Sequence, residues 1–206
     1  MSKEFTIVYF FEDIAHERFV RGLVRRAAGE KGLQIREVVG NATHGNRVWS
    51  EMSQYMRHLR SGRLGIPDVL IAVIDGNCHG CNEVKARIRA MVNRSLATIP
   101  YWTAAIPDPH IEAWYLGDTE ALRYILPGSR PEPLQYKCEQ DRYKTALKEA
   151  IRAEGVEPAL GGAEYGADIA RVLNPYPLGK RDKSFGLFWD DVNRIFQNLR
   201  ASSKDS

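Results

Sequence analysis

The apolar residues of this chain fall into two kinds of pattern. Residues 5–11 and 69–74 are continuous runs of aliphatic, β-branched and aromatic side chains. Such runs are typical of strands that are buried on both faces, as in a parallel sheet. Between them, Phe19, Leu23 and Ala27 recur at every fourth position of residues 14–30, which is the spacing of one face of a helix. The chain therefore begins as a strand followed by a helix.

Weaker versions of the same patterns continue to residue 116. Residues 33–39 and 99–106 are strand candidates, and residues 47–59, 81–95 and 110–116 are helix candidates. The Asn and Gly content of residues 40–45 predicts a loop. Strands and helices thus alternate, which predicts an α/β fold with a mostly parallel, Rossmann-like sheet and helices on both faces.

The chain changes character after Asp118. Prolines and glycines interrupt residues 127–133, and residues 175–177 are a Pro-Tyr-Pro sequence that predicts a loop. Helices are expected at residues 140–154, 168–173 and 185–199. We predict two parts: an α/β core over residues 1–125, and a helical and irregular C-terminal extension over residues 126–206 that packs on the core as a cap.

Composition adds only broad limits. A length of 206 residues fits one domain with or without an appendage, and 44% hydrophobic residues are enough for a core. No apolar run approaches the roughly 18 residues of a membrane helix, and the N-terminus lacks the features of a signal peptide. We therefore expect a cytoplasmic protein with no membrane association. The net charge of +3 does not by itself identify a nucleic-acid binder.

Three cysteines are too few, and odd in number, for a disulfide framework. Cys78 and Cys81 form a C-x-x-C pair, but a structural zinc needs about four ligands and no second pair follows. Cys138 and a distant histidine could complete a zinc site, and a redox pair is a further alternative. We favour ordinary reduced thiols, as in cytosolic proteins, and predict no structural zinc.

Acidic residues follow three of the predicted strands. Glu12 ends the first strand, Asp75 ends the third with Asn77 two positions later, and Asp108 and Glu112 follow the fourth. The carboxyl ends of parallel strands meet at one edge of a sheet, where ligands gather. Oxygen ligands there would bind a hard divalent cation, which would offset the repulsion between carboxylates. Any one of these residues could instead cap a helix, but the set predicts a metal site.

Several familiar motifs are missing from the sequence. No G-x-x-x-x-G-K-[ST] or G-x-G-x-x-G follows the first strand, which argues against a P-loop nucleotidase and against a dinucleotide-binding fold. No G-x-S-x-G is present, so the α/β-hydrolase interpretation fails. The acidic set is thus the strongest candidate for chemistry.

This acidic set resembles that of the Toprim domain, which occurs in topoisomerases, primases and nucleases of the overcoming-lysogenization-defect type. That domain has a Glu at the end of its first strand and a D-x-D after a later one. Here residues 10–13 read Phe-Phe-Glu-Asp and residues 74–77 read Ile-Asp-Gly-Asn. The chain resembles more closely a Toprim-like family of uncharacterised bacterial proteins, through Ile-Glu-Ala-Trp-Tyr-Leu-Gly-Asp at residues 111–118 and, more loosely, through residues 183–189. The resemblance spans about residues 5–195.

The resemblance implies a metal-dependent nuclease that hydrolyses phosphodiester bonds of DNA or RNA, in bacterial anti-phage defence, with a partner ATPase or another defence-system subunit. Glu12, Asp75 and Glu112 would be the catalytic residues. The same three, with Asn77, would bind Mg²⁺ or Mn²⁺. Asp13 replaces the Gly that usually follows the first Glu. Asn77 replaces the second Asp of D-x-D and brings no charge to a metal, so the alternative is a non-catalytic Toprim-like sensor or partner subunit.

Other residues would assist this site. His16 follows Glu12 by four positions, and His16 and Asp118 would support the metal ligands from behind; for His16, an exposed structural histidine is the simpler alternative. We also expect that Asp75→Ala abolishes cleavage at little cost in stability, because the change removes repulsion between carboxylates.

A basic group near the C-terminus is the candidate for binding nucleic acid. It follows the Pro-Tyr-Pro sequence and could hold the phosphate backbone, or it could be a solvated loop. Its members are Lys180, Arg181 and Lys183.

Overall fold

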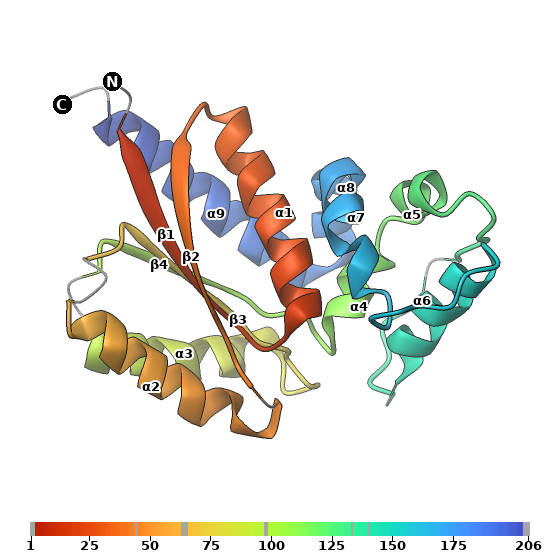
Figure 1. The fold of residues 1–206 in the computed structure, drawn as a ribbon, viewed down its shortest axis with the longest axis horizontal. Helices are drawn as coiled ribbons and strands as arrows, with labels where there is room; N and C mark the ends of the chain where they lie inside the picture. The colour runs from red at the N-terminus through yellow and green to blue at the C-terminus, as the bar shows by residue number, and fades with distance from the viewer. Residues whose placement is uncertain are drawn as a thin grey trace.

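The computed structural model describes residues 3–43, 45–62, 66–96, 99–132, 134–139 and 141–203. At its centre lies a four-stranded parallel sheet with the strand order β2-β1-β3-β4 (Figure 1). The strands are β1 (Glu4–Phe11), β2 (Gln34–Asn41), β3 (Val69–Val73) and β4 (Tyr101–Ala105). The predicted α/β class with a parallel sheet is confirmed.

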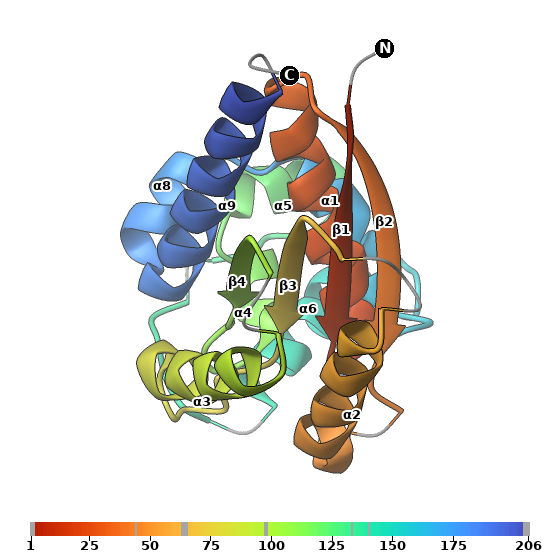
Figure 2. The ribbon, with the colours of Figure 1, turned by 90° about the vertical axis from the view of Figure 1, so that its left-hand side faces the viewer.

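Helices cover both faces of this sheet. α1 (Ile14–Glu30) and α9 (Lys183–Ser202) lie on one face, and α2 (Val48–Arg60) and α3 (Cys81–Ser95) lie on the other (Figure 1 and Figure 2). In β1, residues 5, 7, 9 and 11 pack in the core beneath α1 and α9, whereas residues 8 and 10 pack in the core above α2 and α3. Successive side chains of a strand point to opposite faces, so a continuous apolar run fills both cores.

The second half of the chain is helical. α4 (Ile111–Tyr115) follows β4, and further helices lie to one side of the sheet, on the right in Figure 1: α5 (Thr119–Ile125), α6 (Arg142–Arg152), α7 (Gly166–Val172) and α8 (Pro175–Arg181). α9 then returns to the sheet and packs against β4 and α1. Two 3-10 helices are η1 (Gly45–Arg47) and η2 (Ala163–Tyr165). None of the helices in the described ranges combines the length and apolar composition that crossing a membrane requires.

Two of the predicted loops are regular structure. Residues 40 and 41 extend β2 alongside β1, and Gly40 suits that position because a Cβ there would meet the ring of Tyr55 at 2.6 Å. Residues 175–177 begin α8, where proline is tolerated because the first N–H groups of a helix have no partner within it. α5 was not predicted at all. Turn-forming residue types therefore misled where a close contact or a helix start required them.

The expectation of reduced thiols is wrong for two of the three cysteines. Cys78, in the loop after β3, forms a disulfide with Cys138, in the segment before α6, across a sequence separation of 60. Cys81 is free. The disulfide ties the β3–α3 loop to the C-terminal extension. Disulfides are rare in the cytoplasm, so this one does not fit the reduced thiols that we expected of a cytosolic protein.

Candidate metal centre at the carboxyl ends of the strands

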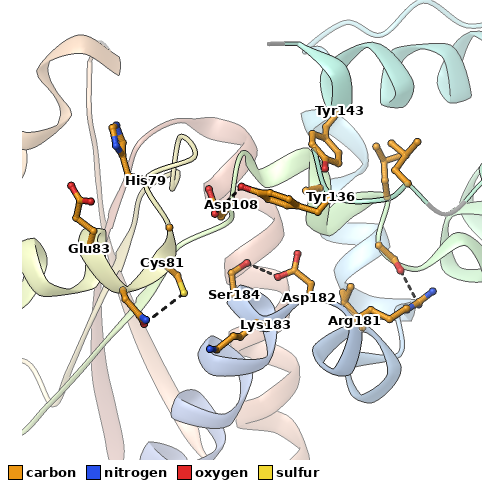
Figure 3. Close-up of a pocket in the computed structure, with 17 residues that line it drawn as sticks. His79, Cys81, Glu83, Asp108, Tyr136, Tyr143, Arg181, Asp182, Lys183 and Ser184 are labelled. Carbon is orange, nitrogen blue, oxygen red and sulfur yellow. Dashed lines mark hydrogen bonds between the residues drawn. The ribbon is translucent and has the colours of Figure 1, made fainter. Parts of the chain in front are cut away.

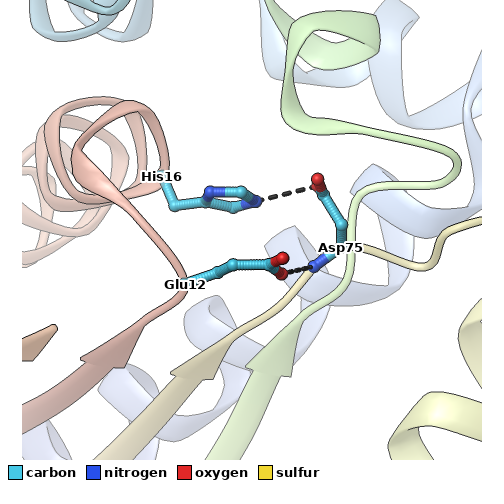
Figure 4. Close-up of side chains that lie close together, drawn as sticks. All are labelled: Glu12, His16 and Asp75. Carbon is cyan, nitrogen blue, oxygen red and sulfur yellow. Dashed lines mark hydrogen bonds and ion pairs between the residues drawn. The ribbon is translucent and has the colours of Figure 1, made fainter. Parts of the chain in front are cut away.

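Two carboxylates and a histidine meet where β1 and β3 end (Figure 4). The N–H of Glu12 donates to the carbonyl of Val73 at 3.0 Å, which holds the two strand ends together. The N–H of Asp75 donates to Oε2 of Glu12 at 2.9 Å. His16, on the first turn of α1, reaches the carboxylate of Asp75. One ligand atom from each of Glu12, His16 and Asp75 lies within 4.8 Å of the other two, and we call these three residues the strand-end cluster.

His16 is fully buried and contacts a carboxylate at each ring nitrogen. Its Nδ1 lies 2.7 Å from Oδ1 of Asp13, and its Nε2 lies 2.8 Å from Oδ1 of Asp75. Asp13 also caps α1 by accepting from the N–H groups of Ala15 and His16. Burial alone would lower the pKa of His16, but the charge of Asp75 and the hydrogen bonds to both carboxylates raise it well above the ordinary 6.5. A carboxylate acceptor at each ring nitrogen thus favours the protonated ring.

Asp75 is the best-compensated carboxylate of the cluster. Its other oxygen, Oδ2, lies 3.1 Å from Nδ1 of His110, so two histidines hold one carboxylate. Burial would raise the pKa of Asp75, but the charge of His16 and hydrogen bonds from both histidines outweigh it and lower the pKa. The expected repulsion at Asp75 is thus already offset. Asp75→Ala would leave Nε2 of the buried His16 without a partner, and so would cost stability, contrary to the expectation from sequence.

Two carboxylates lack this compensation. Burial, and next the charge of Asp75, raises the pKa of Glu12 above its ordinary 4.5. Burial also raises the pKa of Glu112; a backbone hydrogen bond opposes this change and Asp75 adds to it. Glu112 is only 7% exposed, and its buried Oε2 has no hydrogen-bond partner in the described ranges. A buried carboxylate oxygen without a donor is costly, and a bound cation would remove that cost.

The remaining predicted metal ligands are not in the strand-end cluster. Glu112 lies outside the group of three, close enough to Asp75 for their charges to interact. Asn77 is exposed, has a left-handed backbone with φ 47°, and donates its side-chain N–H to the carbonyl of Asp75 at 3.4 Å. Gly76 is required between them, because a Cβ there would meet Oδ1 of Asp108 at 2.7 Å.

Asp118 is occupied by backbone amides. Its Oδ1 accepts from the N–H groups of Glu120 and Ala121 at 3.1 and 3.2 Å, and its Oδ2 accepts from that of Asn174 at 2.7 Å. These bonds cap α5 and join it to the start of α8. They account for the burial of Asp118, and none of them involves the strand-end cluster.

The predicted basic group lies on another side of α4. Lys180, Arg181 and Lys183 are exposed, and Arg181 donates to the carbonyl of Gly117 at 2.8 Å. Arg181 and Lys183 line a cavity of about 680 Å³ between the start of α3, the end of α4 and the start of α9 (Figure 3). We call it the large cavity. No member of the strand-end cluster lines it, and acidic side chains on its walls offset the basic ones.

Sequence reasoning placed His16 behind the ligands and considered His110 for the same place without including it in the site, and in the structure both histidines hold Asp75. Their signal in the sequence is modest: His16 lies one helical turn beyond Glu12, and His110 lies two residues before Glu112. The bonds to Asp75 depend on loops from three strand ends converging, which spacing alone does not specify.

Comparisons with protein-family models, with curated proteins and with solved structures find no match to this chain.

Proposed function

We propose that the protein is a divalent-metal-dependent phosphodiesterase that acts on nucleic acid, with a Toprim-like core on which the C-terminal extension forms a cap. The observation that carries the proposal is the buried Oε2 of Glu112, which lacks a partner beside the strand-end cluster. Together with the raised pKa of Glu12, it indicates a place where a bound cation would stabilise the charged form of both carboxylates. The nucleic-acid substrate comes from the resemblance of residues 10–13, 74–77 and 111–118 to Toprim-like nucleases.

The residues present fit a divalent cation. Glu12, Asp75 and Glu112 offer the carboxylate oxygens that Mg²⁺ and Mn²⁺ prefer. His16 is hydrogen-bonded to a carboxylate at each ring nitrogen, so it has no nitrogen free for the ion and holds Asp75 instead. A bound divalent ion would lower the pKa of a water molecule and stabilise charge on a phosphate.

Some residues of the site would bind the metal ion, and others position the residues that bind it. Glu12 and Glu112 supply carboxylate charge that burial disfavours and that the surrounding cations and hydrogen bonds offset only in part. His16 and His110 fix both oxygens of Asp75 in place, and Asp13 fixes the ring of His16 from behind. Such supporting bonds keep metal ligands in one orientation and raise their affinity.

A second candidate function belongs to a different class. Asn77 stands where the D-x-D pattern has its second Asp, and its amide bonds to the loop backbone. A site with one charge fewer favours a sensor or partner subunit that binds metal without cleaving. Anti-phage defence, a partner ATPase and a cytoplasmic location are further parts of the proposal that rest on the resemblance or on the sequence alone.

The test uses purified full-length protein and labelled DNA and RNA, single- and double-stranded, with Mg²⁺, Mn²⁺ or EDTA. Calorimetric titration measures metal binding on the same preparations. Glu12→Gln is the diagnostic variant, because glutamine keeps an oxygen to accept from Asp75 N–H while removing the charge. Asp168→Asn, at an exposed ion pair with Arg171, is the matched control.

We expect metal-dependent cleavage by the wild type and by Asp168→Asn, and a loss of metal binding and cleavage in Glu12→Gln. A wild type that binds metal yet leaves every nucleic acid intact would favour the sensor. A wild type that binds neither Mg²⁺ nor Mn²⁺ would refute both candidates.

A further inference from the structure

A second, smaller cavity opens beside Glu112. It has a volume of about 230 Å³ and lies between the start of α1, α4, α6 and residues 160–163. We call it the small cavity. Glu112 and Tyr115 present one face of α4 to it, whereas Ala113 and Leu116 present another face to the large cavity. Of the two cavities, the small one is thus lined by a proposed metal ligand, Glu112.

Both carboxylates and lysines line the small cavity. Asp13 and Glu112 contribute the carboxylates, and Oε2 of Glu112 is the buried oxygen that has no partner in the described ranges. Lys144 and Lys148 lie one helical turn apart on α6 and so project from the same side of that helix. Lys144 is close enough to influence the pKa of both Glu112 and His110.

The side chains of the two lysines make no polar contact within the described ranges. Within the described ranges, neither forms an ion pair or a hydrogen bond, although most arginines of α1 and α6 do. The side chain of Lys148 lies near the turn at Gly161, where an added Cβ would be 3.9 Å from Cε of the lysine. Unpaired cations held next to a carboxylate site are suited to an anion that also meets the metal.

We propose that Lys144 and Lys148 bind the phosphodiester backbone of nucleic acid in the small cavity and position a phosphate against the metal held by Glu12, Asp75 and Glu112. This inference rests on the proposed function and assigns its substrate-binding residues. It replaces Lys180, Arg181 and Lys183 in that role.

Size and charge favour a phosphate here. A cavity of about 230 Å³ is smaller than those that enclose whole drug-sized ligands, but it accommodates a phosphate and part of its sugar. Asp13 and Glu112 would repel a phosphate in the absence of a cation, so binding depends on the divalent ion. The large cavity lacks this coupling, because its basic residues face acidic ones and no metal ligand lines it.

The experiment measures binding of short fluorescein-labelled single-stranded oligonucleotides, one of DNA and one of RNA, by fluorescence anisotropy. Ca²⁺ replaces Mg²⁺ so that binding is read without turnover, and a series of NaCl concentrations gives the salt dependence. The diagnostic variant is Lys144→Ala with Lys148→Ala. The matched control is Lys180→Ala with Lys183→Ala, and Lys144→Arg with Lys148→Arg restores charge. Calorimetry with Mn²⁺ alone follows the metal site.

We expect the alanine pair at α6 to weaken oligonucleotide binding by about tenfold or more. It should also reduce the slope of log affinity against log salt by about 1–2, because binding with fewer phosphate contacts releases fewer counterions. The arginine pair should recover most of the slope, and Mn²⁺ binding should stay unchanged. The DNA and RNA arms show which backbone the cavity prefers.

Unchanged affinity and salt slope in the α6 pair would overturn the inference, and so would a wild type that binds neither oligonucleotide. A loss in the control pair instead would move the backbone to the large cavity. These outcomes are separable from failure of the proposed function, which is read from Mn²⁺ binding and from cleavage by the wild type.

Discussion

The two ends of α4 each carry a buried carboxylate, and the two carboxylates have opposite surroundings. At the N-terminal end, Glu112 is 7% exposed and one of its oxygens has no partner in the described ranges. Just beyond the C-terminal end, Asp118 is 8% exposed and both of its oxygens accept from backbone N–H groups. The two carboxylates are thus almost equally buried, but the described residues supply hydrogen-bond donors for both oxygens of Asp118 and not for Oε2 of Glu112.

The hydrogen-bond partners of Glu112 and Asp118 distinguish a structural carboxylate from a candidate functional one, which the sequence motif does not. Both residues belong to the stretch at residues 111–118 that resembles the Toprim-like family. A satisfied carboxylate stabilises the helix ends that it joins. An unsatisfied one destabilises the fold unless a ligand completes it, and such cost is typical of functional sites. We therefore expect substitutions at the two ends to affect different measurements.

The largest effect is expected at Glu112. Glu112→Gln removes a metal-ligand charge and should lower metal-dependent cleavage by about 100-fold or more, since the metal contributes several kcal/mol to the transition state. The thermal midpoint of the metal-free protein should hold or rise, because the buried charge is removed. Cleavage assays with Mn²⁺ and melts in EDTA on one preparation measure both.

A matched change on another face of α4 is Ala113→Ser, which alters a residue that lines the large cavity. It should leave cleavage within about twofold of the wild type, a change worth under about 0.5 kcal/mol. If Glu112→Gln instead melts earlier and still cleaves, Glu112 is a structural residue like Asp118 and the contrast between the two ends disappears.

The disulfide gives the next largest effect and concerns the large cavity. It joins the β3–α3 loop to the segment before α6, and residues of both line that cavity. Cys138→Ser should lower the free energy of unfolding by about 2–4 kcal/mol, because the cross-link restricts a long loop in the unfolded chain. Non-reducing melts measure it, with Cys81→Ser, at the free thiol, as the control.

Mn²⁺ binding should be the same in Cys138→Ser and the wild type, since neither cysteine of the disulfide belongs to the strand-end cluster. Loss of Mn²⁺ binding would show that the two cavities are not independent. Dithiothreitol should lower the thermal midpoint of the wild type and leave that of Cys138→Ser unchanged. If it also lowers the midpoint of Cys138→Ser, another thiol is responsible.

Asp118 should give a smaller loss of stability. Asp118→Ala leaves three backbone N–H groups at the starts of α5 and α8 without their acceptor, which should cost about 2 kcal/mol. Metal affinity and cleavage should match the wild type at temperatures where the variant is folded. Urea unfolding followed by circular dichroism measures the loss. A variant that keeps its stability but loses metal would assign Asp118 to the site after all.

The sequence predicted β1 and β3 well because these two strands are largely buried on both faces. β1 and β3 leave no polar face that could confuse the period, and the bounds of α1 and α3 match the predicted residues 14–30 and 81–95. The errors fall where tertiary contacts overrule local residue type. Gly40 lies in a strand because it pairs with Phe10 of β1, and the ring of Tyr55 leaves no room there for a Cβ. The disulfide pairs cysteines that no local pattern relates.

The candidate site was predictable in its acids and not in its bases. Glu12 and Asp75 follow strands, and the carboxyl ends of parallel strands share an edge by topology alone. Lys144 belongs to a helix in the C-terminal extension, and nothing in the order of strands indicates which helix covers the edge. Lys180, Arg181 and Lys183 attracted attention through clustering in sequence, but clustering does not specify the face of α4 on which a group lies.

The smallest effect is expected at Glu37 of β2, a carboxylate that is neither satisfied by amides nor left unpaired. Burial would raise its pKa, but ion pairs with Arg21 and Arg25 lower it below the ordinary 4.5. Because a lowered pKa means that the folded state favours the charged form, these pairs stabilise the protein above about pH 4.5, and the contribution disappears as the pH falls through the lowered pKa. Arg21 and Arg25 are partly exposed, so Glu37→Gln should cost only about 1 kcal/mol at pH 7.

Urea titrations from pH 7 down to about pH 3 measure this cost, and the difference in the free energy of unfolding between variant and wild type should shrink toward zero at the acid end. A difference that stays constant with pH would mean that Glu37 contributes through packing, and a loss at pH 7 as large as that of Asp118→Ala would show that charged partners satisfy a carboxylate in this fold as fully as backbone amides do.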